Sequence, residues 1–188
     1  MAHVDKNAFL KGVSGSVGKT FVIRTVGDKT IMAIAPGKRT KSPSAKQVAH
    51  QDTFKSAANY GKAVMANPVD KGEYGTKKRK PFESEYNLAV TDFLTPPQVL
   101  ELDTAGYKGK KGELIRVRAT DDFAVKSVKV QVLASDGSLF EEGLAVSQTN
   151  GLDWLYKGST EVLDMTGAKV VATATDKPGN TGVLEKVM

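Results

Sequence analysis

The hydrophobic pattern of this chain changes its period at one point, the proline pair at residues 96–97. Before it, at residues 84–94, apolar side chains recur three and four positions apart, which is typical of one face of a helix. After it, as at residues 115–119, apolar and polar side chains alternate, which is typical of a strand with one buried face. The change predicts two domains, a basic hairpin-and-helix module at 1–95 and a β-sandwich at 96–188.

The first domain opens with a predicted β-hairpin. Two runs rich in β-forming residues, 20–26 and 30–35, flank a Gly-Asp pair that favours a tight turn. Both faces of this hairpin carry large apolar side chains, although one following helix can cover only one face. We therefore expect the hairpin to be an interface between copies of the chain. The expected interface residues are Phe21, Val22, Ile23, Ile31, Met32 and Ile34.

Two helices are predicted after the hairpin. Serine followed by proline at 42–43 favours a helix start, and Asn-Pro at 67–68 favours its end. A polar loop is expected at 69–81, and a second helix at 84–94. This order of elements places a small hairpin and two helices ahead of the alternating region.

The second domain is predicted to be entirely β. Alternation recurs at 128–132 and 170–174, and Asp-Gly, Asn-Gly and Pro-Gly-Asn signals separate the runs. About seven short strands within ~90 residues are typical of a β-sandwich. Trp154, the single tryptophan, is expected in its core. The fold class is therefore α+β.

Two stretches resemble known groups of proteins. Ala-Thr-Asp-Asp-Phe-Ala-Val at 119–125 and Ala-Thr-Asp-Lys-Pro-Gly-Asn at 174–180 resemble bacterial immunoglobulin-like domains. Residues 15–65, with a Gly-x-x-Gly-Lys hairpin, an Ala-Pro stop and an alanine-rich helix, resemble uncharacterised proteins of Bacteroidota. The first resemblance implies an immunoglobulin-like sandwich. The second names a group without a known activity and brings no functional residues.

Charge is distributed unevenly along the chain. Residues 1–92 hold 16 Lys and Arg against 8 Asp and Glu, whereas residues 93–188 hold 11 against 13. A basic half favours an anionic partner, which is nucleic acid, an acidic protein surface or the acidic half of another copy. The basic run for such a partner is Lys77, Lys78, Arg79 and Lys80. A solvated loop with no partner is the alternative interpretation of this run.

Four oxygen-bearing side chains are predicted to meet at one end of the sandwich. The loop after its second strand and the loop before its last strand lie at the same end of such a fold. These loops carry Asp121, Asp122, Asp176 and Asn180. Side chains of this kind bind calcium, and they also form turns by accepting hydrogen bonds from nearby backbone. Turn formation is the favoured interpretation, so no cofactor is predicted, and a calcium site is the alternative.

Nothing in the sequence assembles a catalytic set. The chain has no cysteine and only two histidines, His3 and His50, in unrelated contexts. Gly18-Lys19-Thr20 lacks the glycine that a phosphate-binding loop places five positions earlier, and a strand rather than a helix is predicted after it. No apolar run is long enough to span a membrane.

The predicted function is that of a non-catalytic structural protein that self-associates, as a component of a filament, shell or particle. The alternative is a nucleic-acid-binding protein that uses the basic first half. The N-terminal residues lack the pattern of a secretory signal, so the expected location is the cytoplasm, or outside the cell by a route without a cleaved signal.

Overall fold

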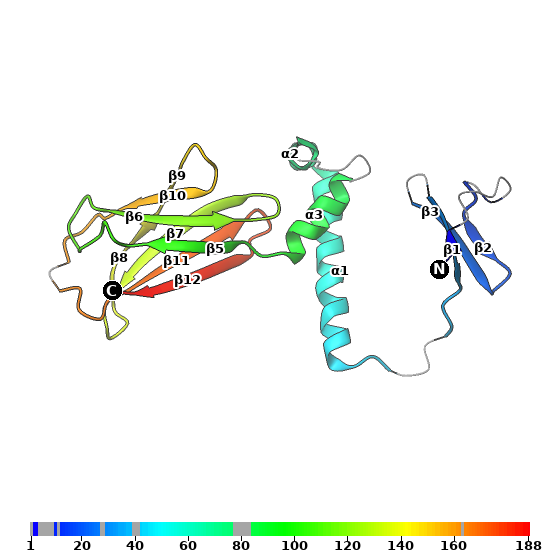
Figure 1. Cartoon of the computed structure of the whole chain (residues 1–188), viewed down its shortest axis with the longest axis horizontal. Coiled ribbons are helices and arrows are strands. Elements are labelled where there is room, and N and C mark those ends of the chain that lie inside the picture. The colour runs from blue at the N-terminus through cyan, green and yellow to red at the C-terminus, as the bar shows by residue number, and fades with distance from the viewer. Residues whose placement is uncertain are drawn as a thin grey trace. The chain divides into compact units, whose positions relative to one another are not determined.

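The computed structural model contains two compact units, Met1–Ala49 and His50–Met188. Helices occupy the first half of the chain and strands dominate the second, so the predicted α+β class is confirmed (Figure 1). The residues that the structure describes are 2–3, 10, 12–26, 29–38, 42–76, 84–162 and 164–188. The predicted boundary at residues 95 and 96 lies within the second unit, and the division into modules 1–95 and 96–188 stays a prediction.

The first unit is built around an antiparallel sheet with strand order β1-β4-β3-β2. The predicted hairpin strands are present as β3 and β4, but two short outer strands were not predicted. The four strands are β1 (Ala2–His3), β2 (Gly15–Val17), β3 (Phe21–Val26) and β4 (Lys29–Ile34). The Gly-Asp turn between β3 and β4 lies outside the described residues.

The first helix, α1 (Ala45–Ala66), starts later than predicted. The side-chain oxygen of Ser44 accepts a hydrogen bond from the Gln47 amide at 3.4 Å, and the Gln47 side chain accepts one from the Ser44 amide at 3.0 Å. This reciprocal pair is a capping box, which satisfies two amides that have no partner inside the helix. The predicted start at 42–43 is therefore wrong.

The expected polar loop at 69–81 is also wrong for the residues that the structure describes there. Helix α2 (Pro68–Thr76) follows α1 directly, because the Asn67 side chain accepts a hydrogen bond from the Val69 amide at 3.0 Å. The Asn-Pro pair thus ends one helix and starts the next, since proline is well suited to the first helical position. The next helix, α3 (Glu85–Leu94), agrees with the prediction and is capped by Ser84.

The C-terminal half forms two antiparallel sheets, with strand orders β5-β6-β10-β9 and β12-β11-β7-β8. Inward-facing residues alternate with outward-facing ones, as the sequence predicted. The strands are β5 (Gln98–Asp103), β6 (Leu114–Thr120), β7 (Val125–Leu133), β8 (Leu139–Leu144), β9 (Val146–Ser147), β10 (Asp153–Lys157), β11 (Lys169–Asp176) and β12 (Thr181–Val187).

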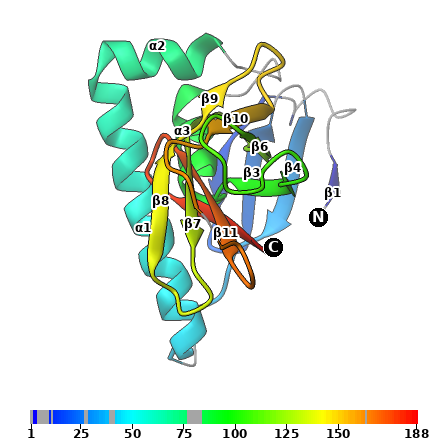
Figure 2. The ribbon, with the colours of Figure 1, turned by 90° about the vertical axis from the view of Figure 1, so that its left-hand side faces the viewer.

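The two sheets face one another (Figure 2). They share one hydrophobic core. Ile115 and Val117 come from one sheet and Val130 and Val170 from the other, and all four are fully buried. Trp154 is 8 % exposed and belongs to this core, as predicted. Burial of apolar side chains from both sheets is the main force that holds them together.

A second, smaller core joins the helices to the sandwich. It contains Val64 from α1, Tyr74 from α2, Ala89 from α3 and Phe123 from the loop between β6 and β7. The rings of Tyr74 and Phe123 lie 4.2 Å apart between centroids. This core brings the last turn of α3 close to the loops at one end of the sandwich. In the described part of the chain, no helix combines the length and the apolarity needed to cross a bilayer.

Candidate functional site

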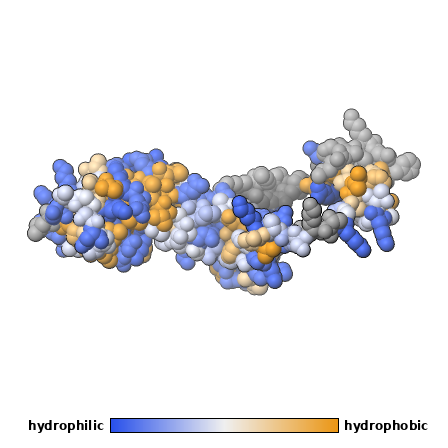
Figure 3. Space-filling model, turned by 90° about the horizontal axis from the view of Figure 1, so that it is seen from below, coloured by the Kyte–Doolittle hydropathy of each residue, from blue (hydrophilic) through white to orange (hydrophobic). Residues whose placement is uncertain are grey.

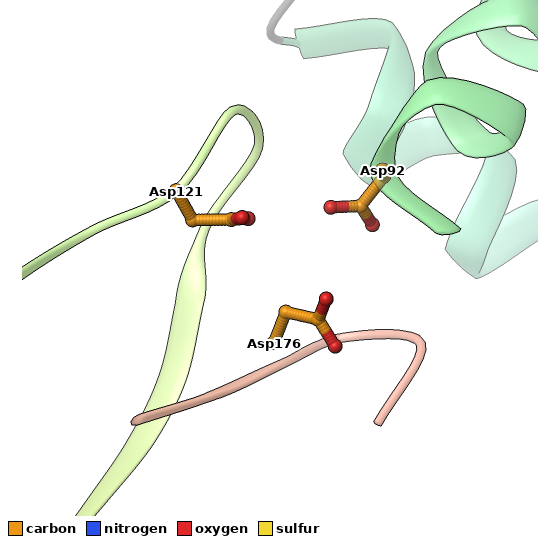
Figure 4. A group of neighbouring side chains, drawn as sticks. All are labelled: Asp92, Asp121 and Asp176. Atoms are coloured by element: carbon orange, nitrogen blue, oxygen red, sulfur yellow. The ribbon is translucent and has the colours of Figure 1, made fainter. Parts of the chain in front are cut away.

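Three aspartates from three separate segments converge beside this smaller core (Figure 4). Asp92 lies in the last turn of α3, Asp121 directly follows β6, and Asp176 ends β11. One carboxylate oxygen from each lies within 4.8 Å of the others. The sequence predicted that Asp121 and Asp176 would meet at one end of the sandwich, and the structure brings them together.

Local turns hold the two sandwich aspartates in place. One oxygen of Asp121, Oδ2, accepts hydrogen bonds from the amides of Phe123 and Ala124 at 3.1 and 2.9 Å. Asp176 Oδ1 accepts hydrogen bonds from the amides of Gly179 and Asn180 at 2.8 and 2.6 Å. Turn formation, the favoured interpretation of these residues, therefore does occur. It leaves the second oxygen of Asp121, Oδ1, without a hydrogen-bond partner in the described structure.

Asp92 is the most unusual member of the group. It is only 1 % exposed, and the Tyr74 hydroxyl donates a hydrogen bond to its Oδ2. Its Oδ1 is buried and has no hydrogen-bond partner in the described structure. Burial raises the pKa of Asp92 to about 7, the hydrogen bond from Tyr74 opposes this rise, and the nearby charges of Asp121 and Asp176 add to it.

Within the described part of the chain, no basic side chain forms an ion pair with these three aspartates. Lys177 is adjacent in sequence, but its ammonium group pairs with Asp70 at 2.9 Å and also with the carboxylate of Glu73, both on α2. The three carboxylates therefore concentrate negative charge in a poorly solvated position, which is costly without a proton or a cation.

The other two residues predicted for this site behave differently. Asp122 does not belong to the group of converging carboxylates. Asn180 points its amide NH₂ into the site, where it donates to Asp176 Oδ2 at 2.7 Å and to the backbone oxygen of Phe93 at 3.2 Å. Asn180 thus orients Asp176 and satisfies a carbonyl group at the C-terminal end of α3.

Sequence reasoning missed Asp92, although two signals were available. It lies three residues after Ala89 and four after Leu88, on the apolar face of a predicted helix. It also lies in the last helical turn, where the helix dipole disfavours a negative charge. A carboxylate in such a position needs a compensating partner outside the helix.

The six expected interface residues divide between the two faces of the N-terminal sheet. Strand register places Phe21 opposite Ile34 and Ile23 opposite Met32, so these four residues share one face. Their neighbours Val22 and Ile31 belong to the other face. The exposed fractions differ within the first face, because Ile23 is only 4 % exposed whereas Phe21 and Ile34 are 36 % and 77 % exposed.

The structure gives little support to the other binding sites that the sequence suggested. Lys77, Lys78, Arg79 and Lys80 lie outside the described residues. Gly18-Lys19-Thr20 forms a turn that leads into β3, so no helix N-terminus follows it as a phosphate-binding loop requires. His50 lies exposed in α1.

Comparisons with known proteins give no family. No family model and no curated protein sequence matches the chain. Among solved structures, CopC from Methylosinus trichosporium OB3b is similar with a TM-score of 0.36 and 14% identity, over 48% of this chain and 89% of CopC. An engineered protein is similar with a TM-score of 0.32 and 17% identity, over 55% of this chain and 25% of its own.

Proposed function

We propose that this chain is a non-catalytic structural protein that self-associates through its N-terminal sheet. The observation that carries the proposal is a row of exposed apolar side chains across three strands. Register places Val17 of β2 opposite Phe21 of β3, and Phe21 opposite Ile34 of β4. The three side chains, called the apolar row below, are 54 %, 36 % and 77 % exposed.

A second copy of the chain is the occupant that best fits the apolar row. Covering a large apolar side chain contributes about 1.5–3 kcal/mol, so the row can drive association once other contacts add to it. Hydrophobic atoms also show on the surface of this unit in Figure 3, among hydrophilic ones. The described residues of β2, all exposed, form one edge of the sheet, and an edge strand offers backbone groups to a neighbouring strand.

The uneven distribution of charge favours a head-to-tail association of the copies. Residues 1–49 hold nine Lys and Arg against two Asp and Glu, whereas the rest of the chain holds 18 against 19. A basic unit in one copy is thus attracted to the less basic unit of the next. A head-to-tail contact of this kind is heterologous, and repeated contacts produce rings or open filaments.

We further propose that the sandwich is immunoglobulin-like. Taken in chain order as A, B, C, C′, D, E, F and G, the strands β5 to β12 give sheets A-B-E-D and G-F-C-C′. This strand order supports the proposal, because immunoglobulin domains of the constant type pair strands A-B-E-D and C-F-G, and the sandwich has one additional strand. Such domains commonly serve as binding or spacing modules, and their fold alone assigns no chemistry.

A binding role fits the side chains better than a catalytic one does. Among the described residues, the converging group consists of three aspartates and includes neither a histidine nor a cysteine. Tyr74, which contacts this group, is fully buried and its pKa is raised, above all by burial, so it does not supply a reactive phenolate.

Light scattering coupled to size-exclusion chromatography tests the proposal. We expect the full chain to form oligomers at micromolar concentration, and Ile34→Glu to shift it to monomer because a charge would enter the apolar row. Ser16→Glu is the matched control, because it places the same charge next to Val17 in the sequence. The side chain of residue 16 belongs to the face of the sheet opposite the apolar row. A wild-type chain that stays monomeric at high micromolar concentration contradicts the proposal.

Salt dependence separates this proposal from nucleic-acid binding. Binding to a nucleic-acid backbone weakens steeply as salt rises, because the protein displaces condensed counterions. Association through apolar side chains does not weaken in this way. Tight binding to nucleic acid at low salt by a chain that remains monomeric would favour the nucleic-acid function instead.

A further inference from the structure

We propose that Asp92, Asp121 and Asp176 form a calcium site that fastens the helices to the sandwich. This site is separate from the apolar row and does not depend on self-association. It joins segments far apart in the sequence, since Asp92 belongs to α3 and the two others to loops of the sandwich (Figure 4).

The first argument is the pair of oxygens that the protein itself leaves unsatisfied. Asp92 Oδ1 and Asp121 Oδ1 are both buried, and neither has a hydrogen-bond partner in the described structure. The Asp92 side chain is 99 % removed from solvent and points toward the two other carboxylates (Figure 4). A buried carboxylate oxygen without a partner is rare, because no hydrogen bond offsets the free energy that its removal from water costs. A bound cation supplies the missing partner.

The second argument is the spacing of the oxygens. Calcium binds oxygen at 2.3–2.6 Å, so two oxygens on opposite sides of the same ion lie about 4.6–5.2 Å apart. The three aspartates present oxygens that all lie within 4.8 Å of one another, which one calcium ion can bridge. Three carboxylates supply part of the six to eight ligands that calcium takes, and water completes the shell.

The donor atoms also select among metals. All three are carboxylate oxygens, whereas zinc sites use histidine nitrogen and cysteine sulfur for most of their ligands. Magnesium demands shorter, nearly octahedral bonds and usually keeps several waters with one or two carboxylates. We therefore expect calcium to bind more tightly than magnesium.

The neighbouring residues hold the three carboxylates ready for an ion. The turn amides fix Asp121 Oδ2 and leave its Oδ1 for the metal, and Tyr74 does the same for Asp92 by donating to its Oδ2. Lys177 pairs with Asp70 and Glu73 instead, so its ammonium group does not compete for the position. This arrangement favours a cation over an internal salt bridge.

Isothermal titration calorimetry of the chelator-treated full chain with calcium chloride tests the site. We expect the wild-type chain to bind one calcium ion. The calcium affinity should be at least tenfold lower in Asp92→Asn and in Asp121→Asn. The magnesium affinity of the wild-type chain should be at least tenfold lower than its calcium affinity. Asp136→Asn is the matched control, because it removes the same charge from a turn of the sandwich and should bind calcium like the wild type. Terbium luminescence excited through the tyrosines, and its loss on adding calcium, reports the site in the wild-type chain should a variant fail to fold.

Three results would overturn the inference. They are the absence of saturable calcium binding up to about 1 mM, the upper range for extracellular calcium modules; equal calcium affinity in Asp92→Asn and the wild type; and magnesium binding as tight as calcium binding. The first result, with a rise in thermal stability of Asp92→Asn, would show that a proton shared by the carboxylates takes the place of the metal.

Discussion

The carbonyl oxygen of Pro97 lies directly against Gly182, so that a Cβ atom added to this glycine would be 1.9 Å from it. Pro97 precedes β5, and Gly182 lies in β12, so the contact joins the entry of the sandwich to its last strand. The obstacle is backbone rather than a flexible side chain. It cannot move aside without displacing one of the two strands.

Gly182→Ala should therefore destabilise the chain. Overpacking of this kind costs about 1–3 kcal/mol, and a backbone obstacle favours the upper end of that range. Urea unfolding followed by circular dichroism measures the loss. Gly72→Ala is the control, because a Cβ atom at this helical glycine meets nothing within 4 Å and should stabilise the chain by roughly 0.5–1 kcal/mol. Equal stability of the Gly182→Ala variant and the wild type would contradict the prediction.

Glu141 provides a prediction for pH. Its carboxylate accepts hydrogen bonds from the Tyr107 hydroxyl at 2.6 Å, the Ser159 amide at 2.7 Å and the Thr160 amide at 2.9 Å. Burial alone would raise the pKa of Glu141, but these hydrogen bonds outweigh it and hold the pKa below its usual value. The folded chain therefore binds this proton less readily than the unfolded chain does.

The contribution of Glu141 to the free energy of unfolding should be complete above the unfolded pKa, about 4.3, and disappear as pH falls through the lower folded pKa. Glu141→Gln should cost about 1–3 kcal/mol at neutral pH and much less at low pH, because an NH₂ group replaces one of the two accepting oxygens and faces donors there. Urea unfolding of both chains at about pH 7 and about pH 3 measures the difference. Glu142→Gln is the control, because its carboxylate is 40% exposed and solvent screens its charge. If the difference in the free energy of unfolding between wild type and Glu141→Gln is as large at low pH as at neutral pH, the lowered pKa of Glu141 does not stabilise the fold.

The predicted boundary near residue 95 can be tested with a fragment of residues 98–188. The main core draws its residues from Val99 to Leu184, so we expect the fragment to fold alone. Loss of the helices exposes Phe123, which should lower the midpoint of thermal unfolding relative to the full chain. Near-ultraviolet circular dichroism, sensitive to Trp154 in this core, measures the fold. An unfolded fragment would mean that the helices and the sandwich are one domain.

The sequence predicted the parts of this fold that depend on local period. The alternation of apolar and polar residues at 115–119 indicates β6, because one face of this strand is buried and the other faces water. Residues adjacent in the sequence are enough to show such an alternation. Helix α2 was missed because its nine residues hold a single buried side chain, Tyr74, which gives no apolar periodicity. The short strand β2 was missed for the same reason, since all three of its residues are exposed.

Only the part of the candidate site that lies in the sandwich could be predicted from the sequence. Topology brings Asp121 and Asp176 to one end of a sandwich, so the sequence pattern was enough to pair them. Asp92 arrives from another element, and its position depends on packing of the helices against Phe123, which no local pattern encodes. Asn180 was predicted as a ligand because its side chain carries an oxygen, but the neighbouring carbonyl groups select its NH₂ end.

Substitution of Asn180 tests whether charge governs this site. Its NH₂ group donates to Asp176 Oδ2 at 2.7 Å and to the backbone oxygens of Phe93 and Asp92 at 3.2 and 3.4 Å. Asn180→Ala removes these donors and adds no charge. Asn180→Asp removes them and also places a fourth carboxylate beside the other three, where like charges repel one another.

In the absence of calcium we expect Asn180→Asp to lower the midpoint of thermal unfolding more than Asn180→Ala does. Calcium should then raise the midpoint of Asn180→Asp more than that of Asn180→Ala, because an added carboxylate strengthens the attraction of the site for a divalent cation. Differential scanning calorimetry with calcium and with chelator measures all four midpoints. Both variants lose the same hydrogen bonds, and the alanine also loses side-chain volume. The rise in midpoint on adding calcium is therefore compared within each variant, which separates charge from packing. Equal midpoints for the two variants in both conditions would show that the three aspartates do not act as a charged cation site.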